Sequence, residues 1–296
     1  MKFSQAHIDQ FHRQGFTVVE DFLDTPSLEA AQLALWEVFP RPETYFANPD
    51  AFPIFGRSQF AGLRLFPYPS WSLNRLAVYP DLVDAAQRIC GTRDLDLYKV
   101  ELWGKYAGAI DYEQQHHYDF GNHSLVVPKR ASRFIQMTCF ILLSDVTEAD
   151  APTRIVPRTA SQATPYLPRV LEAGAFEHEE IALTGPAGSL IAYQTDILHR
   201  ATDFTASDRS RFIMLVDFQP RGLQWTGKMA WPNQALSEHW VESVTRMTPY
   251  ERTLFGFPSP DDDYWDKQTI RDVGMRYPDM NMSIYGDTAN RTPQKD

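Results

Sequence analysis

A series of short, strand-like segments after residue 94 is the feature that most constrains the fold of this 296-residue chain. These segments are rich in β-branched and aromatic residues and are separated by turn residues: "LDLYKVELW", "SRFIQMTCFILLSDV", "TRIVP", "EEIALTG", "GSLIAYQTD" and "RSRFIMLVDFQP". No helical pattern lies between them, which argues against a parallel sheet built from βαβ units. The sequence therefore predicts a β-sandwich or barrel core over residues 93–222.

The regions on either side of this core have helical patterns. Before the core we expect helices at 5–14, 27–38 and 80–91, a strand in "FTVVEDFL", and a long Pro-rich and aromatic loop at 39–73 that covers a site. After it we expect a helical extension at 223–285, with a helix near 233–247, and disorder at 286–296. Nothing marks a compositional break, so residues 1–296 are interpreted as one domain, with 1–92 as its N-terminal helices and covering loop.

Composition limits the class of partner. A net charge of -10 and a pI near 5.3 argue against nucleic acid and anionic membranes, because both require clustered Lys and Arg. We therefore expect a small-molecule substrate and a monomer or homodimer. The N-terminal sequence is unlike a signal peptide and no apolar run is long enough to span a membrane, which predicts a cytoplasmic protein. Cys90 and Cys139 lie in apolar contexts and are interpreted as free thiols.

Three short motifs could contribute to a metal site. They are His7-Ile8-Asp9, His117-Tyr118-Asp119 and His178-Glu179-Glu180. Residues two apart share a face only in extended backbone, which excludes the first motif because it falls in a predicted helix. The third continues a run of acidic residues and is interpreted as a solvated strand entry. His117 and Asp119 therefore remain, while His116 points to the opposite face as a packing or hydrogen-bonding neighbour.

A third ligand and a cation follow further along the chain. His199 ends the strand "GSLIAYQTDIL", and Arg211 comes twelve residues later, at the head of the apolar strand "FIMLVDF". A buried guanidinium needs an anionic partner, which could be Asp217 on the same strand or the carboxylate of a ligand. Two His, one Asp and a downstream Arg are the set expected for a non-haem Fe(II) enzyme with a dicarboxylate co-substrate.

Several stretches together resemble the phytanoyl-CoA dioxygenase family: "FSQAHIDQFHRQGFTVVEDFL", "HYDFGNHSLVVP", "FILLSDVTEADAPTRIVPRTA", "GSLIAYQTDILHRATDFTASDRSRF" and "LFGFPSPDDDYW". The resemblance implies a mainly β fold with flanking helices around a double-stranded β-helix, the cupin-like jelly roll. It implies His117, Asp119 and His199 as iron ligands. It also implies that Arg211 binds the distal carboxylate of 2-oxoglutarate, with Arg209 as a rival because the usual spacing is one residue shorter.

The resemblance also implies a reaction. Fe(II), 2-oxoglutarate and O2 would oxidise an unactivated C–H bond, most simply by hydroxylation, with release of succinate and CO2. Because Asp119 is present, halogenation is disfavoured. The chain departs from the family where Ala151-Pro152 replaces its usual Gly-Pro turn, where Pro157-Arg158-Thr159-Ala160 replaces Pro-Gly-Ser-His, and where Phe204-Thr205-Ala206 lacks an Asn.

Further side chains are candidates for contacts in the site. Gln136 and Thr138 share a strand face and would bind the co-substrate, or form a structural polar ladder. Lys99, Glu101 and Trp103 share a face that meets either the substrate or solvent. His123, in a predicted turn, and the aromatic residues Trp225 and Trp231 are candidates on the substrate side; the alternative for the two Trp side chains is a place in the core. The covering loop at 39–73 and the segment at 221–232 indicate a mainly apolar substrate.

Two other functions stay open. One is a cupin-type metal enzyme that does not use 2-oxoglutarate, against which Arg211 speaks. The other is a jelly roll that binds a ligand without catalysis, against which the intact His-Asp-His set speaks. The sequence has no Gly-x-Ser-x-Gly, P-loop or Gly-x-Gly-x-x-Gly motif that would indicate a hydrolase or a nucleotide enzyme.

Overall fold

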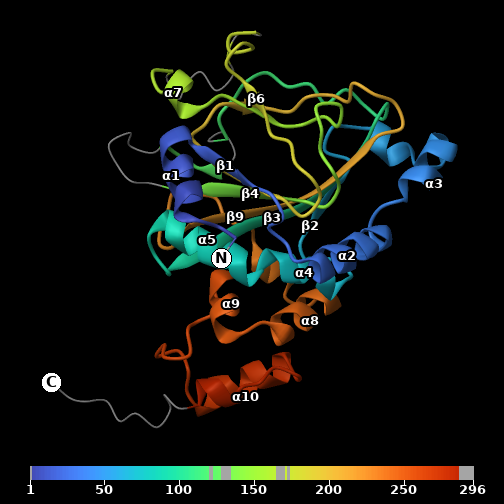
Figure 1. Ribbon diagram of the computed structural model, residues 1–296. Helices are drawn as coiled ribbons and strands as arrows, with labels where there is room; N and C mark the ends of the chain where they lie inside the picture. The colour runs from blue at the N-terminus through green and yellow to red at the C-terminus, as the bar shows by residue number, and fades with distance from the viewer. Residues whose placement is uncertain (1, 120–122, 128–134, 165–170, 172–173, 287–296) are drawn as a thin grey trace. The chain divides into compact units, whose positions relative to one another are not determined.

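Two antiparallel sheets form the core of the computed structural model, which describes residues 2–119, 123–127, 135–164, 171 and 174–286. The larger sheet has six strands in the order β1-β7-β4-β9-β3-β2 (Figure 1). Their bounds are Phe16–Val19, Leu190–Gln194, Met137–Leu142, Ser210–Pro220, Leu95–Tyr106 and Leu63–Leu65. The longest pairing joins β3 and β9, from Leu95 opposite Pro220 to Tyr106 opposite Ser210.

The smaller sheet has three short strands in the order β6-β5-β8, with bounds Ile181–Ala182, Arg154–Ile155 and His199–Arg200. An isolated bridge between His117 and His199 extends this sheet by one more segment. Ile155 and Leu183 pack with Phe140, Ile191 and Leu215 of the larger sheet in one buried cluster. The mainly β, jelly-roll prediction is confirmed, and among the described strands neither sheet closes into a barrel.

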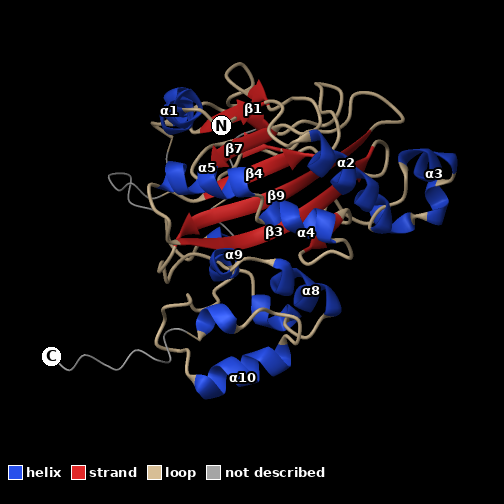
Figure 2. Cartoon of the chain, turned by 60° about the horizontal axis from the view of Figure 1, so that its bottom comes forward, coloured by secondary structure: helices blue, strands red, loops and turns tan. Residues whose placement is uncertain are grey.

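Helices before the core cover one face of the larger sheet. Figure 2 shows α4 (Trp71–Ala77) and α5 (Pro80–Cys90) lying across its strands. The predicted helices at 5–14 and 80–91 match α1 (Gln5–Gln14) and α5 closely, and both end at a glycine in the left-handed conformation. The helix predicted at 27–38 begins earlier, as α2 (Thr25–Ala34), because the Asp24 side chain accepts a hydrogen bond from the Ser27 N–H at 2.8 Å.

The region predicted as an irregular loop, 39–73, contains short elements of regular secondary structure. These are α3 (Pro42–Ala47), the 3₁₀ helices at Pro49–Ala51 and Pro53–Gly56, strand β2 and the start of α4. A further 3₁₀ turn, Leu35–Glu37, follows α2, and the short helix α7 (Arg158–Ser161) follows β5. Aromatic stacking holds the loop to the core, because the Tyr45 and Tyr106 rings lie 4.2 Å apart.

The chain divides into two compact units, residues 1–229 and 230–296. The second unit is helical, with 3₁₀ turns at Trp231–Gln234 and Ser283–Tyr285 and helices α8 (Glu238–Arg246), α9 (Pro249–Leu254) and α10 (Lys267–Arg276). Its Trp231 packs against Trp240 and Phe255, so Trp231 is a core residue of this unit. The end predicted to be disordered lies outside the described residues except for Gly286, and residues 132–134 of one predicted strand also lie outside them.

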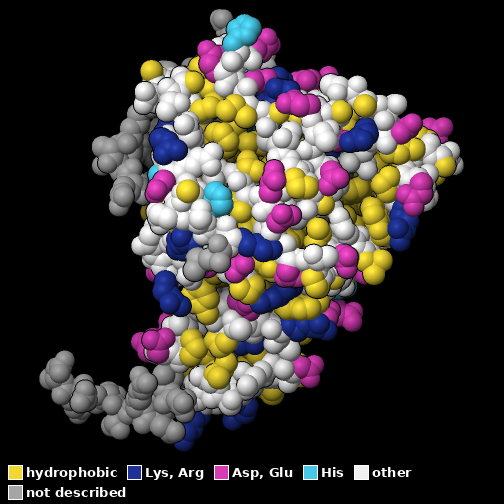
Figure 3. All heavy atoms as spheres, in the orientation of Figure 1, with side chains coloured by type: hydrophobic (Ala, Val, Ile, Leu, Met, Phe, Trp, Pro, Cys, Tyr) yellow, Lys and Arg dark blue, Asp and Glu magenta, His cyan; other side chains and the backbone are white. Residues whose placement is uncertain are grey.

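The structure describes both cysteines and the distribution of charge on one face of the molecule. On the face drawn in Figure 3, basic and acidic side chains are interspersed, with no broad patch of one sign. Cys90 and Cys139 are free thiols. None of the described helices combines the length and the apolar character that crossing a bilayer would require.

Candidate metal centre

A backbone bridge brings the two predicted histidine ligands together. The N–H of His117 donates to the carbonyl of His199 at 3.0 Å, and the N–H of His199 donates to the carbonyl of His117 at 3.2 Å. Both side chains point to the same side of this pairing, with ring centroids 4.6 Å apart. Residues 82 positions apart in the sequence therefore become neighbours.

Asp119 completes the set. Its Oδ1 lies 3.9 Å from His117 Nε2 and 3.4 Å from His199 Nε2, and all three donor atoms lie within 4.8 Å of one another. This is the only such group of three or more His, Cys, Asp or Glu side chains in the described part of the chain. Two imidazoles and one carboxylate that converge from one side can bind a single ion and leave other positions open, which suits Fe(II) in an oxygenase.

The outer nitrogen of each imidazole is fixed by the backbone. His117 Nδ1 lies 2.8 Å from the Gln115 carbonyl, and His199 Nδ1 lies 3.1 Å from the Ile197 carbonyl. A carbonyl can only accept, so each Nδ1 carries the proton and donates it. The lone pair of each Nε2 then faces Asp119, as a metal ligand requires.

The charges at the site favour an ionised Asp119. Burial acts to raise the pKa of this carboxyl group, but His199 and His123 lower it well below its usual range. Burial lowers the pKa of His117, and the nearby His199 lowers it further. Burial acts to lower the pKa of His199, but the Asp119 carboxylate raises it, so a metal ion would compete with a proton for His199 Nε2. The residues present therefore offer two imidazole nitrogens and an ionised oxygen, the donor types that a divalent iron ion binds.

A cavity of about 580 Å³ opens between the sheets, and the three candidate ligands line it. Its wall also contains the predicted substrate contacts Lys99, Glu101, Trp103 and His123. Three residues of the predicted covering region reach it as well, namely Gln59, Phe60 and Leu63. The alternating face of β3 is therefore turned toward the cavity and not toward bulk solvent.

Three other candidates from the sequence do not line this cavity. The amide of Gln136 donates to Gln219 at 2.9 Å and accepts from Thr195 at 3.1 Å, which is the structural role left open for it. Thr138 is buried on β4, opposite Asp217 and Tyr193. The Trp225 carbonyl accepts a hydrogen bond from the Leu125 N–H, and the Trp225 side chain is not part of the cavity wall.

Two cations lie opposite each other in the wall of the cavity. Arg211 on β9 pairs in register with Lys105 on β3, and their relative exposures are 4% and 5%. Arg211 donates from Nη1 to the Ala151 carbonyl, while its buried Nε has no hydrogen-bond partner among the described residues. Burial lowers the pKa of Arg211 to about 10, and burial together with Arg211 lowers the pKa of Lys105 well below its usual value.

The rival cation, Arg209, has another partner. Its Nε and Nη2 donate to Asp150 at 2.6 and 2.7 Å, and its side chain is partly exposed. It does not line the cavity, whereas Arg211 does. Lys105 was missed from the sequence, although it continues the same alternation as Lys99, Glu101 and Trp103.

Asp217, which the sequence suggested as a possible partner of Arg211, forms an ion pair with Lys99 instead. The Lys99 Nζ lies 3.2 Å from Asp217, 3.6 Å from Glu101 and 3.2 Å from His123 Nε2. Burial raises the pKa of Asp217 to about 7. Burial also lowers the pKa of His123 to about 4, so this ring is neutral at pH 7, and its Nδ1 lies 3.0 Å from the Tyr98 hydroxyl.

Glu180 lies on the outer side of the metal ligands, and the interpretation of its side chain from the sequence proves wrong. Glu180 was taken as a solvated charge, but its side chain is only 5% exposed and contacts His116 Nε2 at 2.9 Å. Its neighbours His178 and Glu179 are exposed. Because Glu180 continues this run of exposed charged residues, the sequence alone did not indicate that its side chain is buried. His116 is a hydrogen-bonding neighbour turned away from the ligand atoms.

Comparisons with known proteins bear on the fold and the family of the chain. The carbocyclase SnoK from nogalamycin biosynthesis, described as non-heme and alpha ketoglutarate dependent, is 16% identical, with a TM-score of 0.55 over 78% of this chain and 90% of its own. EctD from S. alaskensis, solved with 2-oxoglutarate and 5-hydroxyectoine, is 17% identical, with a TM-score of 0.54 over 77% and 82%. HygX from Streptomyces hygroscopicus, solved with nickel and 2-oxoglutarate, is 14% identical, with a TM-score of 0.54 over 76% and 97%.

At these identities the three structures establish the fold. No curated protein matches the sequence. The family model for phytanoyl-CoA dioxygenase matches residues 11–213, more than two thirds of the chain, and this range contains all three candidate ligands and Arg211. The chain therefore belongs to the phytanoyl-CoA dioxygenase (PhyH) family.

Proposed function

We propose that this protein is an Fe(II)- and 2-oxoglutarate-dependent dioxygenase that oxidises a C–H bond of a small molecule, with release of succinate and CO2. One observation carries the proposal: the His117, Asp119 and His199 donors and the buried Lys105 and Arg211 cations open on the same cavity. Family membership and the 2-oxoglutarate present in the EctD and HygX structures support it.

His117, Asp119 and His199 would hold the iron. When bound, the iron supplies the activation of O2 that is coupled to decarboxylation of 2-oxoglutarate. The chain itself fixes the imidazoles through the Gln115 and Ile197 carbonyls, so the ligands need little rearrangement to bind.

Lys105 and Arg211 would bind the distal carboxylate of 2-oxoglutarate. No carboxylate among the described residues forms an ion pair with either side chain; Lys105 Nζ instead lies 4.2 Å from the centroid of the Tyr112 ring. Two buried positive charges without such a partner are unfavourable, and an anionic ligand compensates them. The planar guanidinium also matches a carboxylate in shape, and its buried Nε is available to donate.

The rest of the cavity would bind the substrate. Phe60, Leu63 and Phe140 provide apolar surface, while Lys99 and Glu101 provide an ion pair. The Glu101 carboxylate also accepts a hydrogen bond from Trp103 Nε1 at 3.1 Å, which orients it along the cavity wall. We infer a small substrate with a largely apolar body and one polar group that contacts Lys99 or Glu101.

The test is the visible charge-transfer band that forms when 2-oxoglutarate chelates Fe(II) under anaerobic conditions. The unmodified protein should give the band, and Arg211→Ala should need about 100-fold more 2-oxoglutarate, because it removes one partner of a buried charged contact. Arg221→Ala, a matched control just beyond the opposite end of β9, should titrate like the unmodified protein, because Arg221 pairs with the exposed Asp94.

Two results would overturn the proposal. Absence of the band in the unmodified protein would exclude 2-oxoglutarate as the co-substrate and favour a cupin-type metal enzyme or a ligand-binding jelly roll. An unchanged titration for Arg211→Ala would contradict the proposal that Arg211 binds the distal carboxylate of 2-oxoglutarate. Succinate release across a substrate panel, followed by product analysis, then distinguishes hydroxylation from other oxidations, since the relatives include a carbocyclase.

A further inference from the structure

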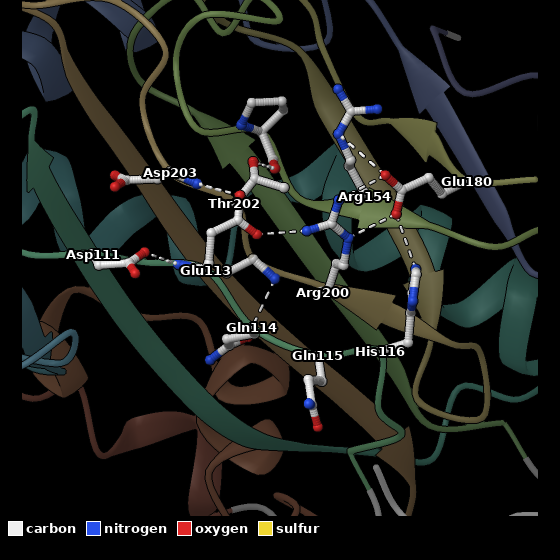
Figure 4. A network of polar contacts seen from close by, with 12 residues as sticks. Asp111, Glu113, Gln114, Gln115, His116, Arg154, Glu180, Arg200, Thr202 and Asp203 are labelled. Atoms are coloured by element: carbon white, nitrogen blue, oxygen red, sulfur yellow. Dashed lines mark hydrogen bonds and ion pairs between the residues drawn. The ribbon is translucent and has the colours of Figure 1, made fainter. Parts of the chain in front are cut away.

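A cluster of charged side chains lies on the outer side of the metal centre. Because side chains alternate along extended backbone, His117 and His199 point inward, whereas the adjacent His116 and Arg200 point outward. Figure 4 shows these outward side chains converging on Glu180, with Arg154 beside them. The proposed reaction does not use this cluster. Two of its members, His116 and Arg200, are nevertheless adjacent in sequence to the ligands His117 and His199.

Glu180 joins the two ligand segments through its carboxylate. Its Oε2 lies 2.9 Å from His116 Nε2 and accepts from Arg200 Nε at 2.7 Å, while its Oε1 accepts from Arg200 Nη2 at 2.8 Å. Arg154 Nε lies 3.6 Å from the same carboxylate. The contact with Arg200 is a two-pronged, charge-assisted pair, which has a well-defined geometry.

Other contacts keep the same two segments in register but do not replace this one. Arg200 Nη1 donates to Glu113 at 2.6 Å, and the Gln114 N–H donates to the Ala201 carbonyl at 3.0 Å. The Glu113 side chain is half exposed, so water competes for its contact. The Glu180 and His116 side chains are 5% and 2% exposed, so water cannot easily satisfy His116 if the carboxylate is removed.

We propose that Glu180 is a positioning residue for the metal centre: by binding His116 and Arg200 together, it reinforces the backbone bridge between His117 and His199 and fixes the orientation of the two segments that carry these ligands. This role rests on the proposed His-Asp-His metal site and is independent of 2-oxoglutarate. Glu180 lies just before β6, so the contact also ties a third chain segment to the two that carry the ligands. Binding sites tolerate displacements of only about 0.5 Å, so small shifts of these segments affect metal binding.

The test compares three variants by their binding of Co²⁺, a spectroscopic substitute for Fe(II). Glu180→Gln should weaken Co²⁺ binding by about 10- to 100-fold and alter the visible ligand-field spectrum, as loss of an outer contact of metal ligands does. Glu180→Asp, which keeps the charge, should recover part of the affinity. Glu148→Gln is the matched control, because Glu148 also pairs with Arg154 but its side chain is 68% exposed, and it should bind within about twofold of the unmodified protein.

The spectrum separates positioning from mere stabilisation. If Glu180→Gln lowers the melting temperature of the metal-free protein but binds Co²⁺ with unchanged affinity and spectrum, the proposal is wrong. If Glu180→Gln does not fold, Arg200→Lys serves the same purpose, because it keeps the positive charge and loses the two-pronged contact; unchanged Co²⁺ binding by this variant would equally contradict the role. Co²⁺ binding requires no co-substrate, so failure of the 2-oxoglutarate proposal leaves this test valid, while absence of Co²⁺ binding by the unmodified protein would overturn the metal site itself.

Discussion

Lys105 and Arg211 lie directly opposite each other on β3 and β9, and both are buried in the wall of the cavity. Like charges in this position disfavour folding, because neighbouring strands hold them side by side. Their nearest partners are the aromatic ring of Tyr112 for Lys105 and the Ala151 carbonyl for Arg211. The arrangement is therefore what a site for an anion requires, at some expense of stability.

Lys105→Met should separate these two effects. We expect it to weaken 2-oxoglutarate binding at least tenfold and to raise the free energy of unfolding at pH 7 by about 1 kcal/mol. The pKa of Lys105 is lowered in the folded protein, so the unfolded chain binds its proton more tightly, and stability rises as pH increases toward the ordinary value of 10.5. The variant should lose this rise.

Anaerobic titration and urea unfolding at pH 7 and 9 measure both effects of Lys105→Met. Lys228→Met is a suitable control, because Lys228 is partly exposed and pairs with Asp96. A variant that is less stable than the unmodified protein, and binds 2-oxoglutarate equally well, would show that Lys105 is a structural residue.

Metal binding should stabilise the first unit of the chain. A ligand that binds only the folded state at 100 times its dissociation constant adds about 2.7 kcal/mol to the free energy of unfolding. We expect an increment of this size with Co²⁺, its reversal by a chelator, and its absence in Asp119→Ala. Asp9→Ala is the control, since Asp9 belongs to the other His-x-Asp motif and is an exposed residue that accepts a hydrogen bond from Gln5. Loss of the increment in Asp9→Ala would place the metal elsewhere.

The sequence predicted the elements of the fold better than the contacts of the site. Alternating patterns identified most strands of the core, and period-two geometry selected His117 and Asp119, because it dictates which side chains share a face. His199 was chosen for its place after a predicted strand and twelve residues before Arg211. The sequence could not show that Asp217 pairs with Lys99, since this depends on the register between β3 and β9. It misread Glu180 for a related reason: burial of that carboxylate comes from Arg200 and His116, which are distant in sequence.

The Asp150 carboxylate should make the protein sensitive to acid. Burial acts to raise the pKa of Asp150, but hydrogen bonds from Arg209 and Thr147 lower it below its ordinary value of 3.8. Because the folded pKa is the lower one, the stabilisation is present above pH 3.8 and is lost as pH falls through the folded pKa. Asp150→Asn should cost about 1–3 kcal/mol at pH 7 and less at pH 3.

Urea unfolding of Asp150→Asn and of the unmodified protein at both pH values checks this expectation. Asp94→Asn is the matched control, because the exposed Asp94 also pairs with an arginine, Arg221. It should stay within about 0.5 kcal/mol of the unmodified protein at pH 7. A constant difference between Asp150→Asn and the unmodified protein from pH 7 to pH 3 would show that ionisation of Asp150 contributes nothing to stability.

Gly62 allows the segment that carries Phe60 and Leu63 to approach β3. Its carbonyl accepts the Gly104 N–H at 3.0 Å, and a Cβ atom at position 62 would lie 1.8 Å from the Gly104 carbonyl oxygen. This oxygen belongs to the backbone of β3, near the end of the strand at Tyr106, so the segment would have to move. Gly62→Ala should therefore cost about 1–3 kcal/mol of unfolding free energy, as overpacking does.

The displaced segment should also affect the substrate side of the cavity more than the co-substrate end. Leu63 pairs with Trp103 and Phe60 packs on its ring, whereas Lys105 and Arg211 belong to β3 and β9 themselves. We expect Gly62→Ala to raise the KM for substrate while the anaerobic 2-oxoglutarate titration stays unchanged. Gly56→Ala, in the same covering region but with only an ordinary 3.5 Å contact to the Ala109 carbonyl, should change neither stability nor KM. If Gly62→Ala matched that control, the close approach to β3 would be unnecessary for holding the cavity wall.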